Sequence, residues 1–300
     1  MNRAVALFKA GSAIARAMPP PMADAVARAG GIGAAHISPA RRAQVERNLR
    51  RIYGPDFRGL ALRRAVDKTF ESYARYWAES FRLPGTSLAA LDAGMSHEGV
   101  EHLDAALAAG RGSIMAIPHL GGWEWAGFWE AAVRKHPVTV VVEKLDPPEL
   151  FEWFVDLRRS FGMQVVPLGP DAASTVARAL KANHVLCLLC DRDIGGGGIE
   201  VEFFGERTHL PAGPATLALR TGAALIPTAA YFQGRRGHLG VCRPPIPIER
   251  TGRLREDVAR ITQLVADELE VLIRREPEQW HLMQPNWPSD YETLERGQVP

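Results

Sequence analysis

From about residue 99 onward, short apolar runs alternate with stretches of helical periodicity. The apolar runs predict strands at residues 114–117, 138–142, 165–166, 185–189, 200–204, 225–232 and 239–242. The periodic stretches predict helices at residues 100–109, 122–133, 147–161, 172–181, 214–221 and 254–272. Short runs bounded by turn residues are typical of buried strands. Strands that alternate with helices favour an α/β fold, in which helices cover both faces of a mainly parallel central sheet.

Residues 1–85 are predicted to form a helical N-terminal extension. Val66, Phe70, Tyr73, Trp77 and Phe81 recur every three or four residues, which predicts a helix packed against the core. Residues 276–300 are rich in Pro and Trp and are expected to be irregular. No repeat or low-complexity linker interrupts the chain, so we expect a single domain with its α/β core at 99–275.

Charge and cysteine content narrow the function classes. The net charge of +2 argues against a dedicated nucleic-acid-binding protein. Three cysteines in 300 residues are too few for a disulfide framework and favour a reducing compartment. No apolar run is long enough for a transmembrane helix. The Ala-rich stretch from Arg3 to Met18 is expected to form a helix, either on an anionic membrane surface or docked on the domain.

Several well-known catalytic motifs are absent from the sequence. It contains no G-x-S-x-G nucleophile elbow, no Walker A loop and no intact G-x-G-x-x-G. Cys187 and Cys190 have C-x-x-C spacing, but residues three apart on a strand face opposite sides of the sheet. We therefore interpret them as core cysteines and expect no metal site.

The clearest candidate site follows the predicted strand at 114–117. His119 comes after Pro118 and before a Gly-Gly pair, at the strand end where open α/β sheets bind ligands. Glu124 follows in an H-x4-E pattern, at the start of the next helix. A carboxylate bonded to one imidazole nitrogen fixes the tautomer and lets the other act as a base. A structural histidine with a solvated glutamate remains the alternative.

Two further clusters carry charge near predicted element ends. Asp191-Arg192-Asp193 follows the strand at 185–189 and precedes a glycine-rich loop, which suits a metal or a polar head group. Arg158 and Arg159 end a helix and could bind a phosphate, although cations there also suit the helix dipole. Each cluster is a weak signal by itself.

In their order along the chain, these motifs resemble the lysophospholipid acyltransferase superfamily. The resemblance is to the branch that holds lipid A late acyltransferases and phosphatidylinositol mannoside acyltransferases. It covers nearly the whole chain and rests on the following segments: Arg47-Asn48-Leu49, the helix through Trp77, Pro118-His119-x4-Glu124, Glu143-Lys144-Leu145, Arg158 with Gly162, Asp191-Arg192-Asp193, Phe203-Phe204-Gly205 and Pro211-Ala212-Gly213-Pro214.

The resemblance implies the chemistry and the residues that carry it. His119 would act as general base on an acceptor hydroxyl, oriented by Glu124 where many members have Asp, and the hydroxyl would attack an acyl thioester. Further residues implied to bind substrate are Arg158, Asp191, Arg192, Asp193, Glu143 and Trp123. A deep apolar groove for the acyl chain is expected to start near His119, with Trp123, Trp125, Phe128 and Trp129 as candidate lining.

The absence of a predicted membrane span and the Ala- and Arg-rich composition favour the mannoside branch. That branch implies transfer of a fatty acyl group, palmitoyl by expectation, from acyl-CoA to a mannose hydroxyl of phosphatidylinositol mannoside. Acyl-CoA would be a co-substrate and no cofactor is expected. The enzyme would be peripheral, on the cytoplasmic face of the plasma membrane.

Three alternatives remain open from the sequence. The first is a lipid A type acyltransferase that uses acyl carrier protein as donor. The second is a metal-dependent glycosyltransferase in which Asp191 and Asp193 hold the ion. The third is a lipid-binding protein without turnover.

Overall fold

The computed structural model describes residues 13, 17–143 and 148–295. The helix expected over residues 3–18 falls largely outside these ranges, as do Lys144 and Leu145. Within them, seven strands form the main sheet in the order β1-β9-β8-β2-β5-β3-β4. Neighbouring strands are parallel except β8 and β9. The bounds are β1 Met95–Glu98, β2 Ser113–Ile117, β3 Val138–Val142, β4 Gln164–Pro167, β5 Val185–Leu189, β8 Ala224–Gln233 and β9 Gly237–Cys242.

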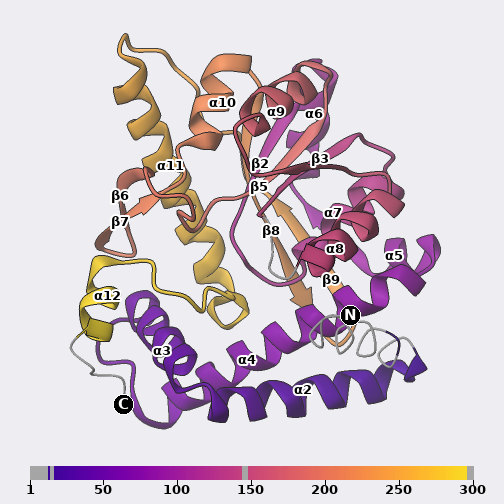
Figure 1. Ribbon diagram of the computed structural model, residues 1–300, viewed down its shortest axis with the longest axis vertical. Helices are drawn as coiled ribbons and strands as arrows, with labels where there is room; N and C mark the ends of the chain where they lie inside the picture. Colours follow the sequence, from indigo (N-terminus) through magenta and orange to yellow (C-terminus); the bar gives the residue numbers. More distant parts are fainter. Residues whose placement is uncertain (1–12, 14–16, 144–147, 296–300) are drawn as a thin grey trace.

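Helices cover both faces of this sheet, as expected (Figure 1). One face packs against α6 (Val100–Ala108), α7 (Trp123–Ala132) and α8 (Pro148–Ser160); the other packs against α9 (Ala172–Lys181), α10 (Gly213–Thr221) and α11 (Leu254–Arg275). The alternation along β2 divides its side chains between the two cores. Ile114 and Ala116 belong to the core under α9 to α11, and Met115 to the core under α6 to α8. The predicted α/β fold is confirmed.

The N-terminal helices have a core of their own at the carboxyl edge of the sheet. They are α2 (Pro20–Ile37), α3 (Pro39–Tyr53) and α4 (Gly59–Arg82), followed by the short α5 (Leu88–Ala93). Val45, Leu49, Val66 and Phe70 pack between them. In Figure 1 the arrowhead of β8 points toward α4, so these helices lie over the strand ends where the candidate site was expected. None of the helices in the described ranges combines the length and the apolarity needed to cross a bilayer.

Four elements differ from the sequence-based expectation. The strand β6 (Ile199–Phe203) was predicted, but it pairs only with β7 (Glu206–Leu210), in a hairpin outside the main sheet. The tail is only partly irregular, because Pro288–Glu295 forms α12. Strands β1 and β7 were not predicted, because neither contains an apolar run. The β1 segment is the mainly polar Met-Ser-His-Glu, and its strand conformation comes from pairing with β9.

Candidate active site

The turn after β2 is held in place by backbone hydrogen bonds. Gly121 has a φ of 60°, and a Cβ at that position would lie 2.1 Å from the carbonyl oxygen of Ala230. The Gly121 N–H donates to the Gln279 carbonyl at 2.9 Å, and the Gly122 N–H donates to the Ala230 carbonyl at 2.8 Å. Glycine is required at position 121 for both its conformation and its close approach. The turn thus presents His119 at a fixed place beyond the strand.

His119 is hydrogen-bonded to Asp191, which follows the neighbouring strand β5. Nδ1 of His119 lies 2.6 Å from Oδ1 of Asp191, and the His119 backbone N–H donates to Oδ2 at 3.0 Å. Because β2 and β5 are parallel neighbours, their carboxyl ends bring the two residues together across 72 positions of sequence. The Asp191 side chain is fully buried, whereas the imidazole remains 23% exposed.

The Asp191 carboxyl is stabilised in its ionised form. Burial alone would raise its pKa, but attraction to His119 and the hydrogen bonds from His119 and Trp280 outweigh burial, so its pKa lies below the usual value. An ionised carboxylate only accepts hydrogen bonds, so the shared proton belongs to Nδ1 of the imidazole. In the neutral imidazole with this tautomer, Nε2 carries the lone pair, and none of the described residues donates a hydrogen bond to it. This is the state of a histidine that can accept a proton from a hydroxyl.

Glu124 contacts Arg158 rather than His119. The Arg158 guanidinium donates to Glu124 Oε1, and both side chains are largely buried between α7 and α8. Burial would lower the pKa of Arg158, but the attraction and hydrogen bond of Glu124 raise it overall. The expected pairing of His119 with Glu124 is therefore not the contact seen here. The physical reason is that Asp191 already occupies Nδ1 of His119, whereas the buried Arg158 guanidinium gives Glu124 its counter-charge.

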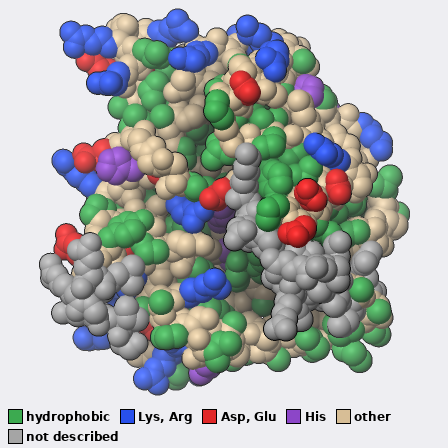
Figure 2. Space-filling view, in the orientation of Figure 1, with side chains coloured by type: hydrophobic (Ala, Val, Ile, Leu, Met, Phe, Trp, Pro, Cys, Tyr) green, Lys and Arg blue, Asp and Glu red, His purple; other side chains and the backbone are tan. Residues whose placement is uncertain are grey.

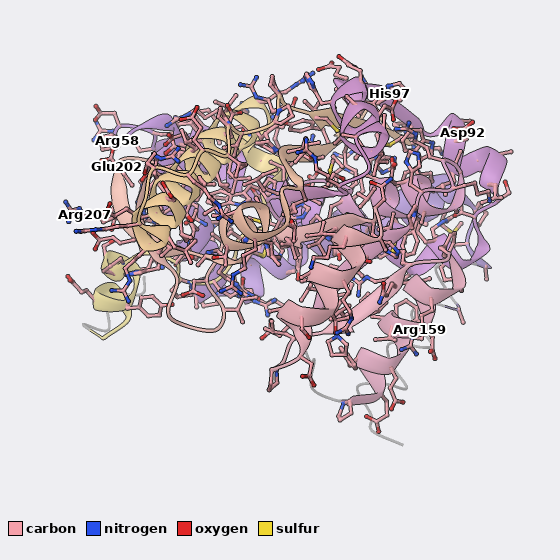
Figure 3. The ribbon with its side chains drawn as sticks, turned by 90° about the horizontal axis from the view of Figure 1, so that it is seen from above. Arg58, Asp92, His97, Arg159, Glu202 and Arg207 are labelled. Atoms are coloured by element: carbon pink, nitrogen blue, oxygen red, sulfur yellow. The ribbon has the colours of Figure 1, made fainter. Side chains whose placement is uncertain are left out.

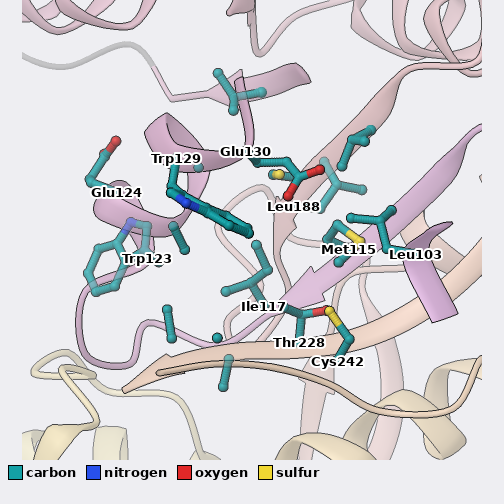
Figure 4. Close-up of a pocket in the computed structure, with 18 of the residues that line it drawn as sticks. Leu103, Met115, Ile117, Trp123, Glu124, Trp129, Glu130, Leu188, Thr228 and Cys242 are labelled. Carbon is teal, nitrogen blue, oxygen red and sulfur yellow. The ribbon is translucent and has the colours of Figure 1, made fainter. Parts of the chain in front are cut away.

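An apolar cavity begins beside this ion pair and extends under the sheet. Trp123 and Glu124 line one end, while Leu103 and Met115 line the other (Figure 4). Of the four aromatic residues expected to line an acyl groove, Trp123 and Trp129 do so. Phe128 is fully buried in the core, and Trp125 stacks on His238 outside this cavity.

Trp123 also contacts the catalytic candidate directly. Its ring meets the His119 imidazole edge-on at 5.6 Å between centroids and stacks on Tyr76 of α4 at 4.0 Å. His281 completes the aromatic cluster, with burial lowering its pKa to about 3, so its ring is neutral. Its backbone N–H donates to the His119 carbonyl at 2.7 Å. The His119 imidazole is therefore bordered by aromatic rings on one side and by Asp191 on the other.

The remaining predicted site residues lie around this centre without contacting His119. Arg192 forms a 3.7 Å ion pair with Glu143, at the ends of β5 and β3. Asp193 accepts a hydrogen bond from the Gly198 N–H at 2.8 Å and so closes the glycine-rich loop. Arg159 is exposed on α8 (Figure 3), whereas its neighbour Arg158 is largely buried against Glu124. The Arg158-Arg159 pair thus does not form one phosphate clamp.

The geometry gives little support to a metal held by Asp191 and Asp193. Both oxygens of Asp191 accept hydrogen bonds from protein donors, and Asp193 is engaged by its own loop. In the described ranges, no group of three or more His, Cys, Asp and Glu side chains has the arrangement of a metal site. Cys187 and Cys190 pack into different cores on opposite faces of the sheet, as predicted.

Besides His281, two residues of the C-terminal segment belong to the site and were not predicted from the sequence. Trp280 Nε1 donates to Asp191 Oδ2 at 2.7 Å, and Asn286 Nδ2 donates to the Asp191 carbonyl at 3.2 Å. The only available signal was the Trp-rich composition of the tail, which gave no indication of a partner. In Figure 2 the face of the molecule shown is hollowed near its centre, with histidine and basic side chains at the hollow.

Comparison with known proteins shows the family of the chain. The family of bacterial lipid A biosynthesis acyltransferases matches residues 3–289. A phosphatidylinositol mannoside acyltransferase of Mycolicibacterium smegmatis is 39% identical over 302 residues, covering 97% of this chain and 94% of that protein. One from Mycobacterium tuberculosis strain H37Rv is 42% identical over 237 residues, covering 77% of this chain and 72% of that protein. The chain is thus an acyltransferase that belongs to the bacterial lipid A biosynthesis acyltransferase family.

Proposed function

We propose that the chain transfers a fatty acyl group, palmitoyl by expectation, from acyl-CoA to a mannose hydroxyl of phosphatidylinositol mannoside. The acceptor is taken from the names of the two relatives, which match most of the chain. The observation that carries the mechanism is the 2.6 Å hydrogen bond between His119 Nδ1 and the buried Asp191. It leaves Nε2 free to act beside an apolar cavity suited to an acyl chain.

The reaction then follows from the site. Nε2 of His119 takes the proton of the mannose hydroxyl as its oxygen attacks the thioester carbonyl carbon. Asp191 stabilises the imidazolium that forms. The tetrahedral intermediate collapses with cleavage of the carbon–sulfur bond, and the imidazolium returns the proton to the departing CoA sulfur. The products are the acylated glycolipid and free CoA.

The other predicted residues take supporting roles in this proposal. Glu124 and Arg158 form the polar end of the apolar cavity, and their paired charges would contact the thioester end of the donor rather than orient His119. Trp123 covers the imidazole edge and shields the reacting atoms from water. The Arg192–Glu143 pair and Asp193 would shape the rim where the acceptor sugar enters.

We further propose that the enzyme works peripherally at the cytoplasmic face of the plasma membrane. A lipid acceptor has to be reached at a bilayer surface. In support, α2 exposes the apolar side chains of Met22 and Val26, one helical turn apart, and exposes Arg28 on another side of the same helix. Apolar and basic residues on one exposed helix are typical of interfacial helices.

The first test is a transfer assay on the purified chain. Incubation with palmitoyl-CoA and phosphatidylinositol mannoside should release free CoA and add one acyl mass to the glycolipid. His119→Ala should lower kcat/KM by at least about 10²-fold, the contribution of a positioned general base. His209→Ala, at an exposed histidine of β7, is the matched control and should keep full activity. Full transfer by His119→Ala would refute the mechanism. Faster transfer from acyl carrier protein than from acyl-CoA would show that the carrier protein is the donor.

A further inference from the structure

A second cavity, much larger than a water site, lies between the N-terminal helices and the sheet. Its volume is about 1,020 Å³, and its walls come from α2, α4, the start of α7 and the turn between β8 and β9. Six basic and two acidic side chains line it, a net charge of +4, whereas the whole chain carries +2. The basic ones are Arg28, Lys68, Arg75, Arg82, Arg235 and Arg236. We call this space the basic cavity.

The cations of the basic cavity fall into two groups. Arg75 is structural: it pairs with Glu79 at 2.8 Å and donates to the carbonyls of Gly234 and Gly237, which fixes the β8–β9 turn. That turn carries Arg235 and Arg236. Neither of these arginines nor Lys68 forms an ion pair with any residue in the described ranges, and all three side chains are exposed. The turn thus offers charge that the fold itself does not neutralise.

The start of α7, which follows the turn with His119, separates the basic cavity from the apolar one. Trp123 and Glu124 line the apolar cavity, and Trp125, two positions further on, lines the basic cavity. Gln279 lines the basic cavity as well, and its carbonyl accepts the Gly121 N–H at 2.9 Å. The two cavities therefore share the start of α7, directly after the turn that carries His119, as a wall.

We infer that the basic cavity binds the phosphodiester head group of an anionic glycolipid acceptor, with Arg235, Arg236 and Lys68 as its principal contacts. The inference rests on the proposed function and extends it, because it gives the acceptor a site separate from that of the acyl chain. Guanidinium groups bind phosphate oxygens with strong charge-assisted hydrogen bonds. An acceptor anchored there by its phosphate would have its sugar hydroxyls next to the turn that carries His119.

A head group fits these residues better than a flat bilayer surface does. The six cations line one hollow rather than a convex face, and a hollow of this volume admits a sugar phosphate while excluding the plane of a membrane. Contact with the bilayer through the same arginines is the competing explanation, and the test separates the two.

The test uses the full chain in detergent micelles and the double variant Arg235→Glu/Arg236→Glu. Arg207→Glu, at an exposed arginine of β7, is the matched charge-reversal control (Figure 3). The double variant should raise the KM for phosphatidylinositol mannoside at least about tenfold, since a hydrogen bond to a charged group contributes on that order. Its KM for palmitoyl-CoA and its acyl-CoA hydrolysis without acceptor should stay within about twofold of the wild type, since neither uses the basic cavity.

A binding measurement separates failure of this inference from failure of the proposed function. By calorimetry, glycerophosphoinositol should bind the wild type and not the double variant, even if no acyl transfer to glycolipid is detected. An unchanged acceptor KM in a working transfer assay would overturn the inference. So would equally tight binding of inorganic phosphate, which would mark a general anion site. Loss of binding to anionic vesicles without glycolipid, with acceptor KM unchanged in micelles, would assign these arginines to the bilayer instead.

Discussion

Asp191 is the residue on which the geometry of the candidate site depends most. One of its oxygens faces His119 Nδ1, and the other accepts from the His119 backbone and from Trp280. A carboxylate with this many fixed donors cannot rotate away from the imidazole. Trp280 therefore acts on the proposed base, His119, through Asp191, as a positioning residue, although it lies far from both in the sequence.

Trp280→Phe should show this effect with little change in packing. Without the indole N–H, the Asp191 carboxylate is less stabilised and its pKa rises. The less stabilised carboxylate attracts the imidazolium form of His119 more strongly, so the pKa of His119 should rise as well. The acidic limb of kcat/KM, a property of the His119–Asp191 pair as a unit, should move to higher pH, and kcat should fall about tenfold. Trp287→Phe removes a different buried indole donor, to the Phe203 carbonyl, and is the matched control. An identical pH profile in both variants would reduce Trp280 to a packing role.

At the scale of elements, the Glu124–Arg158 pair joins α7 to α8. Arg158→Met leaves a buried carboxylate without its partner and should lower the free energy of unfolding by about 3 kcal/mol. The double variant Glu124→Gln/Arg158→Met should recover most of that loss, because no unpaired charge remains. Arg159→Met, one position along on the exposed side of α8, should change stability by less than about 0.5 kcal/mol. Urea unfolding measures all three; equal losses for Arg158→Met and the double variant would contradict the pairing.

The strands around the site show which features could be predicted from the sequence and which could not. Strands β2, β3 and β5 were located within a residue because their apolar runs are set by burial on both faces of the sheet. The segment with His119 was found because a strand end with glycines is a local signal. The predicted partner of His119 was wrong. Local spacing pointed to Glu124, five positions away, whereas Asp191 comes close to His119 only because β2 pairs with β5. Contacts that depend on the order of strands in the sheet cannot be predicted from the spacing of residues along the sequence.

At the scale of the whole molecule, the C-terminal segment connects α3 to the candidate site. Asp290 of α12 is fully buried and pairs with Arg51 at 2.9 Å and Arg47 at 3.0 Å on α3. It also accepts the Asn286 N–H at 3.1 Å, and Asn286 in turn donates to the Asp191 carbonyl. Through these contacts the N-terminal helices fix the tail, and the tail fixes the carboxylate that orients His119.

Asp290→Asn tests this connection through both stability and pH. Burial alone would raise the pKa of Asp290, but attraction to Arg51 and several hydrogen bonds lower it overall. A carboxyl whose folded pKa is depressed stabilises the fold above its unfolded pKa, about 3.9, and loses that contribution as pH falls through the folded value. We therefore expect Asp290→Asn to lower the free energy of unfolding by about 3 kcal/mol at pH 6.

The difference between the wild type and Asp290→Asn should then shrink as the pH is lowered below about 3.9, because the wild-type carboxyl becomes protonated as well. Urea unfolding at a series of pH values measures it, with Asp156→Asn, an exposed carboxylate of α8, as control. At pH 6 and a temperature where Asp290→Asn stays folded, its acyl transfer should also fall, since Asn286 loses its anchor. If Asp290→Asn is destabilised but folded and keeps full transfer, the contacts of Asp290 stabilise the tail without affecting the orientation of His119.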